Sequence, residues 1–236
     1  MRYAVLGTGS VGRTLAARLA GLGHEAVVGT RDPGATLART GTDAYGNAPF
    51  AAWQSAHPGV ALATFADAAA GAETVVNASS GAASLGVLTA AGAANLAGKT
   101  LVDVANPLDF SHGAPPALDP VNTDSLGEQI QRAFPEAKVV KTLNTMNAAV
   151  MADPARVPGA HTVFVSGDDA DAKKAVTALL ESFGWPSASV IDLGGIATAR
   201  GTEMLLPVWL RLYGVIGHPD FNFHIARGGT AAAAGA

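Results

Sequence analysis

The chain has 236 residues, of which 49% are hydrophobic and 14% charged, so it can bury a sizeable core and is too apolar to be disordered. Its formal charge of −4 gives no sign of a nucleic-acid or anionic-membrane partner, and the lack of cysteine excludes disulfides, thiolate metal sites and cysteine nucleophiles. An apolar run starting at residue 2 leaves no room for a signal peptide, and no unbroken apolar stretch predicts a membrane span, so we expect a cytoplasmic protein.

Residues 1–31 predict a dinucleotide-binding unit. Residues 2–6 form an apolar stretch typical of a buried strand, apolar residues at helical spacing follow up to residue 22, and residues 25–29 predict a second strand. The intervening turn fits G-x-G-x-x-G and consists of Gly7, Thr8, Gly9, Ser10, Val11 and Gly12. In that context the glycines allow a tight turn, close approach of a pyrophosphate and close helix packing, and the helix N-terminus attracts phosphate.

The end of the second predicted strand indicates which nucleotide binds. An NAD site places Asp or Glu there to hold the ribose 2′-hydroxyl, whereas this chain has Thr30 and Arg31. A hydroxyl and a guanidinium suit a 2′-phosphate, because Arg binds phosphate through a planar fork of donors. Asp32 precedes Pro33 and is expected to cap the next helix. The pattern predicts NADP(H).

The next elements bring small and hydroxyl residues to a strand end. We expect helices over 48–57 and 65–70 and strands over 60–64 and 73–78. In a doubly wound sheet, ligands lie beyond the carboxyl ends of the strands, near the point where strand order reverses. Ala78 and Ser79 should therefore border the nicotinamide ribose. Ser79 or Ser80 could equally cap the following helix, and both roles are compatible.

Two later strand ends carry amides. The expected elements are a helix over 82–96, a strand over 99–104, a loop over 108–123, a helix capped by Thr123 or Asp124, and a strand over 137–143. Asn106, Thr142, Asn144 and Thr145 follow or end these strands and are predicted to bind cofactor, since amides can both donate to and accept from a carboxamide or a flavin-like ring edge. The amides could instead cap the next turn. The long loop is a candidate wall of the site.

The remaining chain predicts further elements packed on the same sheet. We expect strands over 161–165 and 190–193, a helix over 170–183, an apolar helix over 196–216 kinked at Pro207, and an edge strand over 221–225. The apolar helix could belong to the core or to a dimer interface. The prediction is a single α/β domain over 1–227, Rossmann-like and doubly wound with a mostly parallel sheet, followed by a flexible tail over 228–236.

No residue is assigned as catalytic. The six histidines show no metal-ligand spacing, so no metal site is expected, and no Tyr-x-x-x-Lys pair is present. Lys138 and Lys141 lie on a predicted strand without an evident acid–base partner. Hydride transfer between two cofactor rings depends more on their orientation than on a protein acid or base, so the lack of such residues is compatible with it.

Several motifs resemble the NADPH:coenzyme F420 oxidoreductases, or F420-dependent NADP oxidoreductases, and the related cytosolic domain of Steap metalloreductases. The resemblance lies in Gly7–Gly12, Gly23–Glu25, Gly29–Arg31, Val139–Thr145, Val163–Asp169, Asp192–Gly195 and Thr202–Leu206. It implies one α/β domain that binds NADP and passes hydride to a deazaflavin (F420) or a flavin (FAD or FMN). By this resemblance Thr8–Val11 would hold the pyrophosphate, Thr30 and Arg31 the 2′-phosphate, Ala78 and Ser79 the nicotinamide half, and Thr142–Thr145 would face the second ring.

Two alternative functions stay open. One is an NADPH-dependent reductase of a small organic substrate, because the small residues at 78–82 replace the bulky aromatic or proline and nearby histidine that often follow the fourth strand in that family. The other is a non-catalytic NADP(H)-sensing protein. The expected partners are a small-molecule hydride acceptor or donor and, as a candidate, a second copy of the chain, with neither nucleic acid nor membrane.

Overall fold

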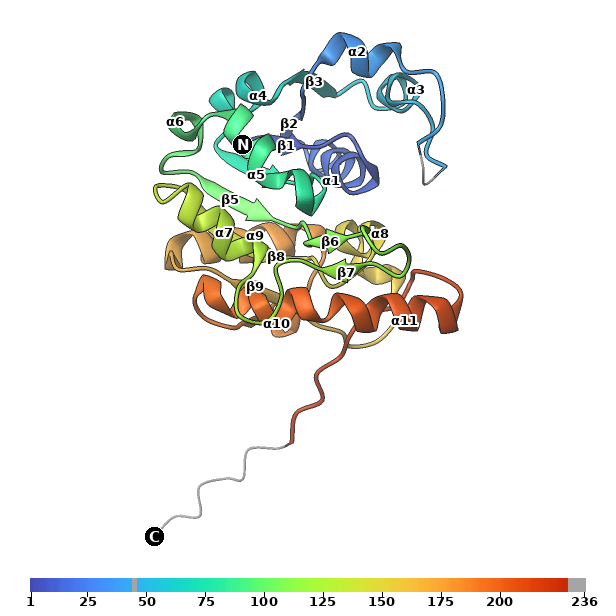
Figure 1. Cartoon of the computed structure of the whole chain (residues 1–236), viewed down its shortest axis with the longest axis vertical. Coiled ribbons are helices and arrows are strands. Elements are labelled where there is room, and N and C mark those ends of the chain that lie inside the picture. Colours follow the sequence, from blue (N-terminus) through green and yellow to red (C-terminus); the bar gives the residue numbers. More distant parts are fainter. Residues whose placement is uncertain (44–45, 229–236) are drawn as a thin grey trace.

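One twisted sheet of eight strands organises the part of the chain that the computed structural model describes, residues 1–43 and 46–228 (Figure 1). Its strands are β1 (Arg2–Leu6), β2 (Glu25–Thr30), β3 (Val60–Thr64), β4 (Thr74–Asn77), β5 (Thr100–Asp103), β8 (Lys138–Thr142), β9 (Val163–Ser166) and β10 (Val190–Asp192). They lie in the order β10-β9-β8-β5-β4-β1-β2-β3, and β8 and β9 form the antiparallel pair. The predicted fold class, a doubly wound and mostly parallel sheet with C-terminal elements added to it, is confirmed.

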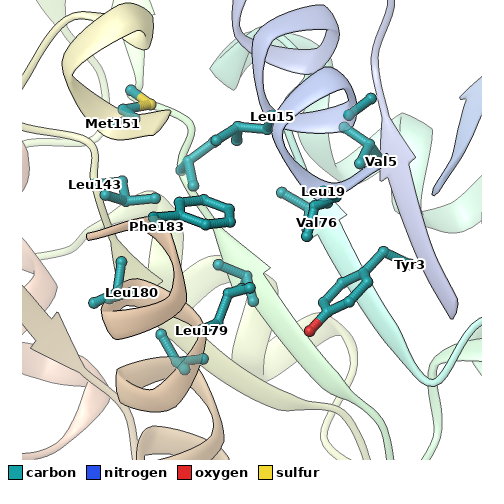
Figure 2. Packing of buried hydrophobic residues seen from close by; sticks show 14 of the residues in the cluster. Tyr3, Val5, Leu15, Leu19, Val76, Leu143, Met151, Leu179, Leu180 and Phe183 are labelled. Carbon is teal, nitrogen blue, oxygen red and sulfur yellow. The ribbon is translucent and has the colours of Figure 1, made fainter. Parts of the chain in front are cut away.

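Helices cover both faces of the sheet. They are α1 (Ser10–Gly21), α2 (Pro33–Ala38), α3 (Phe50–Ser55), α4 (Phe65–Gly71), α5 (Ser84–Ala91), α6 (Ala93–Leu96), α7 (Leu126–Ala133), α8 (Ala148–Ala152), α9 (Ala170–Phe183), α10 (Ala199–Met204) and α11 (Leu206–Ile216). Side chains alternate along each strand, so Val5 packs towards α1 and α9 while Leu6 packs towards α4 and α5. Figure 2 shows the core on the side of the sheet that α1 and α9 cover, where Leu15 and Leu19 of α1 belong to the same cluster as Phe183 of α9.

Several predicted boundaries were wrong for local reasons. The helix expected over 82–96 is a 3-10 turn followed by α5 and α6, which meet at Gly92, where φ is +92°. Helix α7 is capped by Ser125 rather than by Thr123 or Asp124, so it begins one or two residues later than expected. The Ser125 hydroxyl oxygen accepts from Glu128 N at 3.1 Å, and the hydroxyl donates to Glu128 Oε2 at 2.7 Å. The Ser125 hydroxyl thus satisfies the backbone N–H and one carboxylate oxygen of Glu128, whereas the Asp124 carboxylate is engaged by Arg132.

The loop over 108–123 contains a short hairpin of β6 (Leu108–Asp109) and β7 (Ala117–Leu118), which was not predicted. The edge strand expected over 221–225 does not form. That segment lies beside the start of β9 without pairing regularly: Thr162 N donates to Phe223 O at 2.8 Å, and Asn222 Nδ2 donates to Thr162 O at 2.9 Å. The predicted tail over 228–236 lies outside the described residues except for Gly228.

Helix α11 packs loosely on the rest of the chain. It starts at the break near Pro207, as expected, and Val208 is 50% exposed while Val215 is 85% exposed. Trp209 stacks on Tyr213 and on Phe221, at ring-centroid distances of 5.5 and 5.1 Å. None of the helices in the described ranges combines the length and apolar character needed to cross a membrane.

Candidate functional site

The glycine-rich turn brings the ends of three neighbouring strands together. Gly7 has a φ of +135°, its N–H donates to Gly29 O at 3.1 Å, and a Cβ at Gly7 would lie only 2.8 Å from the carbonyl carbon of Ala78. Helix α1 starts immediately afterwards with Gly9 as its N-cap residue. Because glycine has no side chain to cap the first turn, the N–H groups at the start of α1 are available to an anion.

The end of β2 supplies a surface arginine. Thr30 is buried, with its hydroxyl 2.9 Å from that of Thr36, while Arg31 is exposed. Asp32 caps α2 by accepting from Ala35 N at 2.9 Å, which confirms the cap predicted for it. The Thr30 hydroxyl is therefore partly engaged by its neighbour, and Arg31 is the exposed cationic side chain at this strand end.

A loop before α3 ties down the first turn of α1. Asn47 Nδ2 donates to the Ser10 hydroxyl at 2.7 Å, and Arg13 Nε donates to Thr8 O at 2.7 Å while Arg13 Nη1 reaches Ala48 O. A cavity of about 290 Å³ opens beside these residues. The sequence contains no signal for this contact, because 37 residues separate Asn47 from Ser10.

At the end of β4, Ser79 turns back onto the sheet. Its hydroxyl donates to Asn77 Oδ1 at 2.7 Å and lies 3.1 Å from the Ser84 hydroxyl. Ser80 occupies the N-cap position of the 3-10 turn that follows, as the capping alternative allowed, but neither Ser79 nor Ser80 makes a capping bond through its side chain. The fully buried Asn77 sets the position of Ser79 instead.

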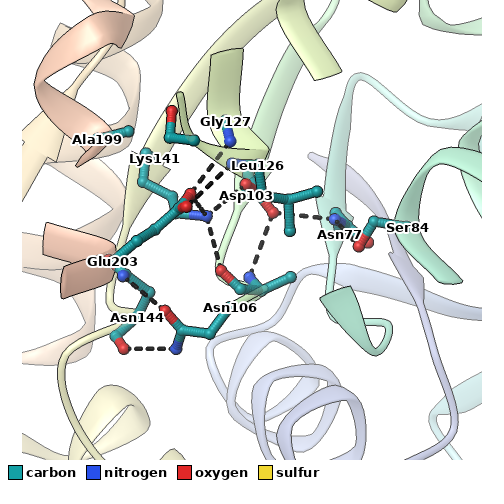
Figure 3. Close-up of polar contacts among 12 residues, drawn as sticks. Asn77, Ser84, Asp103, Asn106, Leu126, Gly127, Lys141, Asn144, Ala199 and Glu203 are labelled. Atoms are coloured by element: carbon teal, nitrogen blue, oxygen red, sulfur yellow. Dashed lines mark hydrogen bonds and ion pairs between the residues drawn. The ribbon is translucent and has the colours of Figure 1, made fainter. Parts of the chain in front are cut away.

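Two asparagines from neighbouring strand ends hold each other. Asn106 Nδ2 donates to Asn144 O at 2.8 Å, and Asn144 Nδ2 donates to Asn106 Oδ1 at 3.0 Å (Figure 3). Asn106 also lies against the turn after β4, since a Cβ at Gly81 would be 2.6 Å from the Asn106 carbonyl carbon. The predicted residues after β1, β4, β5 and β8 therefore form a continuous row. The space beside Gly81 is filled by the backbone at Asn106.

The other residues predicted on β8 are buried. The Thr142 hydroxyl donates to Phe164 O at 2.7 Å, so it serves the pairing with β9, and Thr145 is 2% exposed. Asn147 caps α8 by accepting from Ala149 N at 2.9 Å, so one amide of this stretch does have the capping role.

The structure overturns the expectation that Lys138 and Lys141 lack partners. Lys138 lies 3.2 Å from Asp169 at the surface. Lys141 is buried, and its Nζ lies 2.7 Å from both Asp103 Oδ2 and Glu203 Oε1. Burial by itself lowers the pKa of the Lys141 ammonium, but the two carboxylates outweigh burial, so the pKa is raised above its ordinary value. Lys141 is therefore charged at neutral pH.

The sequence contains part of the signal for this cluster, a charged residue in each of two apolar strands, but the pairing of those strands comes from the structure. Asp103 and Lys141 are charged residues within apolar strands, and they are register partners in the pairing of β5 with β8. Opposite charges at matched positions of neighbouring buried strands indicate a pair, because an isolated buried charge is costly. Glu203 carries no such signal, since it lies in a separate helix. Within the described residues, no group of three or more His, Asp or Glu side chains is placed to hold a metal ion.

A glycine-rich turn between β1 and α1, placed where the order of a parallel sheet reverses, defines a Rossmann-type dinucleotide-binding protein. Residues 2–107 match the family model described as NADP oxidoreductase, coenzyme F420-dependent. The chain is 67% identical to a candidate F420-dependent NADP reductase from Arthrobacter sp. FB24, whose crystal structure matches with a TM-score of 0.92 over 96% of this chain and 100% of that one. This chain belongs to the F420-dependent NADP oxidoreductase family.

Two further comparisons extend this result. The chain is 30% identical over 213 residues to metalloreductase STEAP3 of Rattus norvegicus, covering 88% of this chain and 38% of STEAP3, so it spans well under half of that relative. A reductive aminase from Aspergillus terreus in complex with NADPH and ethyl levulinate is 17% identical, with a TM-score of 0.60 over 92% of this chain and 62% of that chain, and shows the same fold.

Proposed function

We propose that this protein transfers hydride between NADPH and a deazaflavin (F420) or a flavin. The observation that carries the proposal is the row of neutral polar groups at adjoining strand ends: the Ser79 hydroxyl after β4 and the paired amides of Asn106 and Asn144 after β5 and β8. Such groups can orient two planar rings without a charge that would favour proton transfer, and hydride transfer requires mainly that the rings stack in the right orientation.

In this proposal NADP(H) lies across the carboxyl ends of the strands. The pyrophosphate lies against Thr8–Val11 at the start of α1, and the 2′-phosphate lies beside Arg31 and Thr30, with the nicotinamide half next to Ala78 and Ser79. The support is the uncapped start of α1, the exposed position of Arg31 and the contact between Gly7 and Ala78. The order of the ends of β2, β1 and β4 in the sheet matches the order of the three parts of the nucleotide.

The second ring lies beside Asn106, with the buried Asn144 and Thr145 behind it. The Asn106 side-chain amide has two N–H groups and uses one of them in the asparagine pair, so this half-buried residue retains a donor for a ring carbonyl or carboxamide. The hairpin β6–β7 begins directly after Asn106 and Pro107 and is proposed to form the outer wall of this half of the site.

The test is thermal unfolding of the protein alone and with NADPH, NADH, F420, FAD and FMN, singly and in pairs, followed by anaerobic single-turnover measurement of nicotinamide absorbance. A ligand at a hundredfold its Kd stabilises by about 2.7 kcal/mol, which is about 5–11 °C in Tm for a chain of this size. Stabilisation by NADPH, a further shift with one ring cofactor and hydride transfer to it are expected. Binding of NADPH with no transfer to any of the three rings would contradict the proposal and favour a small organic substrate or a sensor.

We also propose that the chain forms a homodimer through α11. The apolar residues Val208, Val215 and Ile216 are exposed on this helix, and burying such a face against a second copy is the usual way to remove it from water. Light scattering during gel filtration measures the mass directly, and a monomer across the accessible concentration range would contradict the proposal.

A further inference from the structure

The ammonium group of Lys141 is bonded to three segments of the chain. Its Nζ lies 2.7 Å from Asp103 Oδ2, 2.6 Å from Ala105 O and 2.7 Å from Glu203 Oε1 (Figure 3). An ammonium has three N–H donors, so all of them are used. Lys141 is fully enclosed and has no donor left for a ligand. Any effect on a bound cofactor must therefore act through the groups that it holds.

One branch of this network leads to the turn after β4. Asp103 Oδ1 accepts from Asn77 Nδ2 at 2.9 Å, and Asn77 Oδ1 in turn accepts from the Ser79 hydroxyl at 2.7 Å and from Ser79 N at 3.3 Å. Asn77 and Asp103 are both 0% exposed, so water does not compete for these bonds. The position of Ser79 therefore depends on the position of the Asp103 carboxylate, which Lys141 holds.

The other branch leads to the asparagine pair. Lys141 holds the carbonyl of Ala105, and Ala105 N donates to Asp103 Oδ1 at 3.2 Å, so the backbone just before Asn106 is fixed on both sides. Asn106 then pairs with Asn144. Lys141 is thus connected through hydrogen bonds both to Ser79 and to the Asn106–Asn144 pair.

Glu203 anchors the cluster to the C-terminal part of the chain. Its Oε2 accepts from Leu126 N at 2.9 Å and its Oε1 accepts from Gly127 N at 3.1 Å, at the start of α7. The second carboxylate is thereby stabilised by the positive end of that helix. A buried ion pair is seldom more stable than an apolar replacement of the same size, so folding stability alone is a poor reason for this cluster.

We propose that Lys141 is a positioning residue that holds the nicotinamide half of the site in place, while the adenosine half binds independently of it. This inference rests on the proposed function, which places the nicotinamide beside Ser79. It assigns to a fully enclosed lysine, whose donors are all used within the protein, control over affinity for one end of the dinucleotide.

The experiment compares two ligands on two matched variants. NADPH contains the nicotinamide, whereas 2′,5′-ADP carries the 2′-phosphate and lacks it. Lys141→Met removes the buried ammonium, and Lys138→Met, on the same strand, removes an exposed one that is paired with Asp169. Calorimetric titration of Lys141→Met should show NADPH binding weakened about tenfold, which equals about 1.4 kcal/mol, with 2′,5′-ADP within about twofold of the wild type. Lys138→Met should change neither.

Three results would overturn the inference: unchanged NADPH affinity in Lys141→Met, equal weakening of both ligands, or the same selective loss in Lys138→Met. If Lys141→Met does not fold, Glu203→Gln provides a second test, because it keeps the lysine paired with Asp103. Glu203→Gln should weaken NADPH binding about threefold and leave 2′,5′-ADP binding unchanged. Wild-type affinity of this variant for both ligands would then overturn the inference. These titrations need no hydride acceptor, so they test the role of Lys141 separately from the proposed reaction. If the wild-type protein binds both ligands but reduces neither F420 nor a flavin, only the proposed acceptor is contradicted.

Discussion

The contact between Gly12 and the glycine-rich turn makes a quantitative prediction about Gly12→Ala. A Cβ at this position would lie 2.9 Å from the carbonyl carbon of Gly7 and closer still to its oxygen. Ordinary contacts between heavy atoms are about 3–3.5 Å or longer, and the oxygen is the closer obstacle, so α1 would have to move away from the turn by roughly 1 Å. The obstacle is backbone, which cannot adopt another rotamer to make room.

The expected cost follows from two opposing effects. Overpacking against a rigid neighbour costs about 3 kcal/mol at the upper end of its usual range, and alanine is favoured over glycine within a helix by about 1 kcal/mol. The net loss is about 2 kcal/mol, which for a chain of this length lowers Tm by about 4–8 °C. Gly9→Ala is the matched control, because a Cβ there meets nothing within 4 Å and φ is −76°.

The assay is calorimetric or fluorescence-detected unfolding of the ligand-free variants, followed by NADPH titration. Gly9→Ala should unfold within about 2 °C of the wild type but bind NADPH at least about tenfold more weakly, since its methyl group would occupy the space proposed for the pyrophosphate. A wild-type Tm for Gly12→Ala would refute the close approach of α1 to the turn. Wild-type NADPH affinity for Gly9→Ala would refute the placement of the pyrophosphate.

Further predictions concern single side chains. Arg31→Ala should weaken NADPH binding by about 1.5–3 kcal/mol and NADH binding hardly at all. Arg39 is also exposed, and Arg39→Ala is the control, which should bind both nucleotides normally. Equal losses of affinity for both nucleotides in Arg31→Ala would show that Arg31 does not bind the 2′-phosphate. Ser125→Ala should destabilise the protein by about 1 kcal/mol in denaturant titrations through loss of the α7 cap, and an unchanged midpoint would contradict this. The bidentate hydrogen bonds from Arg132 are the main reason that the pKa of Asp124 is lowered to about 2, so its stabilisation is complete above about pH 4 and is lost as pH falls towards 2. Because the Arg132 side chain is 60% exposed, the pair is screened by solvent and is worth less than about 1 kcal/mol. Asp124→Asn should therefore lower Tm slightly at about pH 6 and not at about pH 2, and a pH-independent difference would contradict the assignment.

The local sequence determined the elements whose signals are short-range. Strands such as β1 and β2 are runs of apolar residues, α1 and α9 have apolar residues at helical spacing, and the glycine turn and the Asp32 cap act within a few residues. Periodicity and turn chemistry are properties of consecutive residues, so they could be predicted before any tertiary contact was known. The site residues after β1, β4, β5 and β8 were predicted to lie together for a related reason, since parallel strands end at one edge.

The tertiary structure alone decided which groups at that edge hold one another. Lys141 and Asp103 are 38 residues apart, and Glu203 lies 77 residues beyond Leu126, whose N–H it accepts. The segment over 221–225 alternates as a strand does, yet it bonds irregularly to Thr162 because β9 already has neighbours on both sides in the sheet. A buried charge requires a partner, but which partner it finds depends on how strands and helices pack, and neither propensity nor periodicity contains that information.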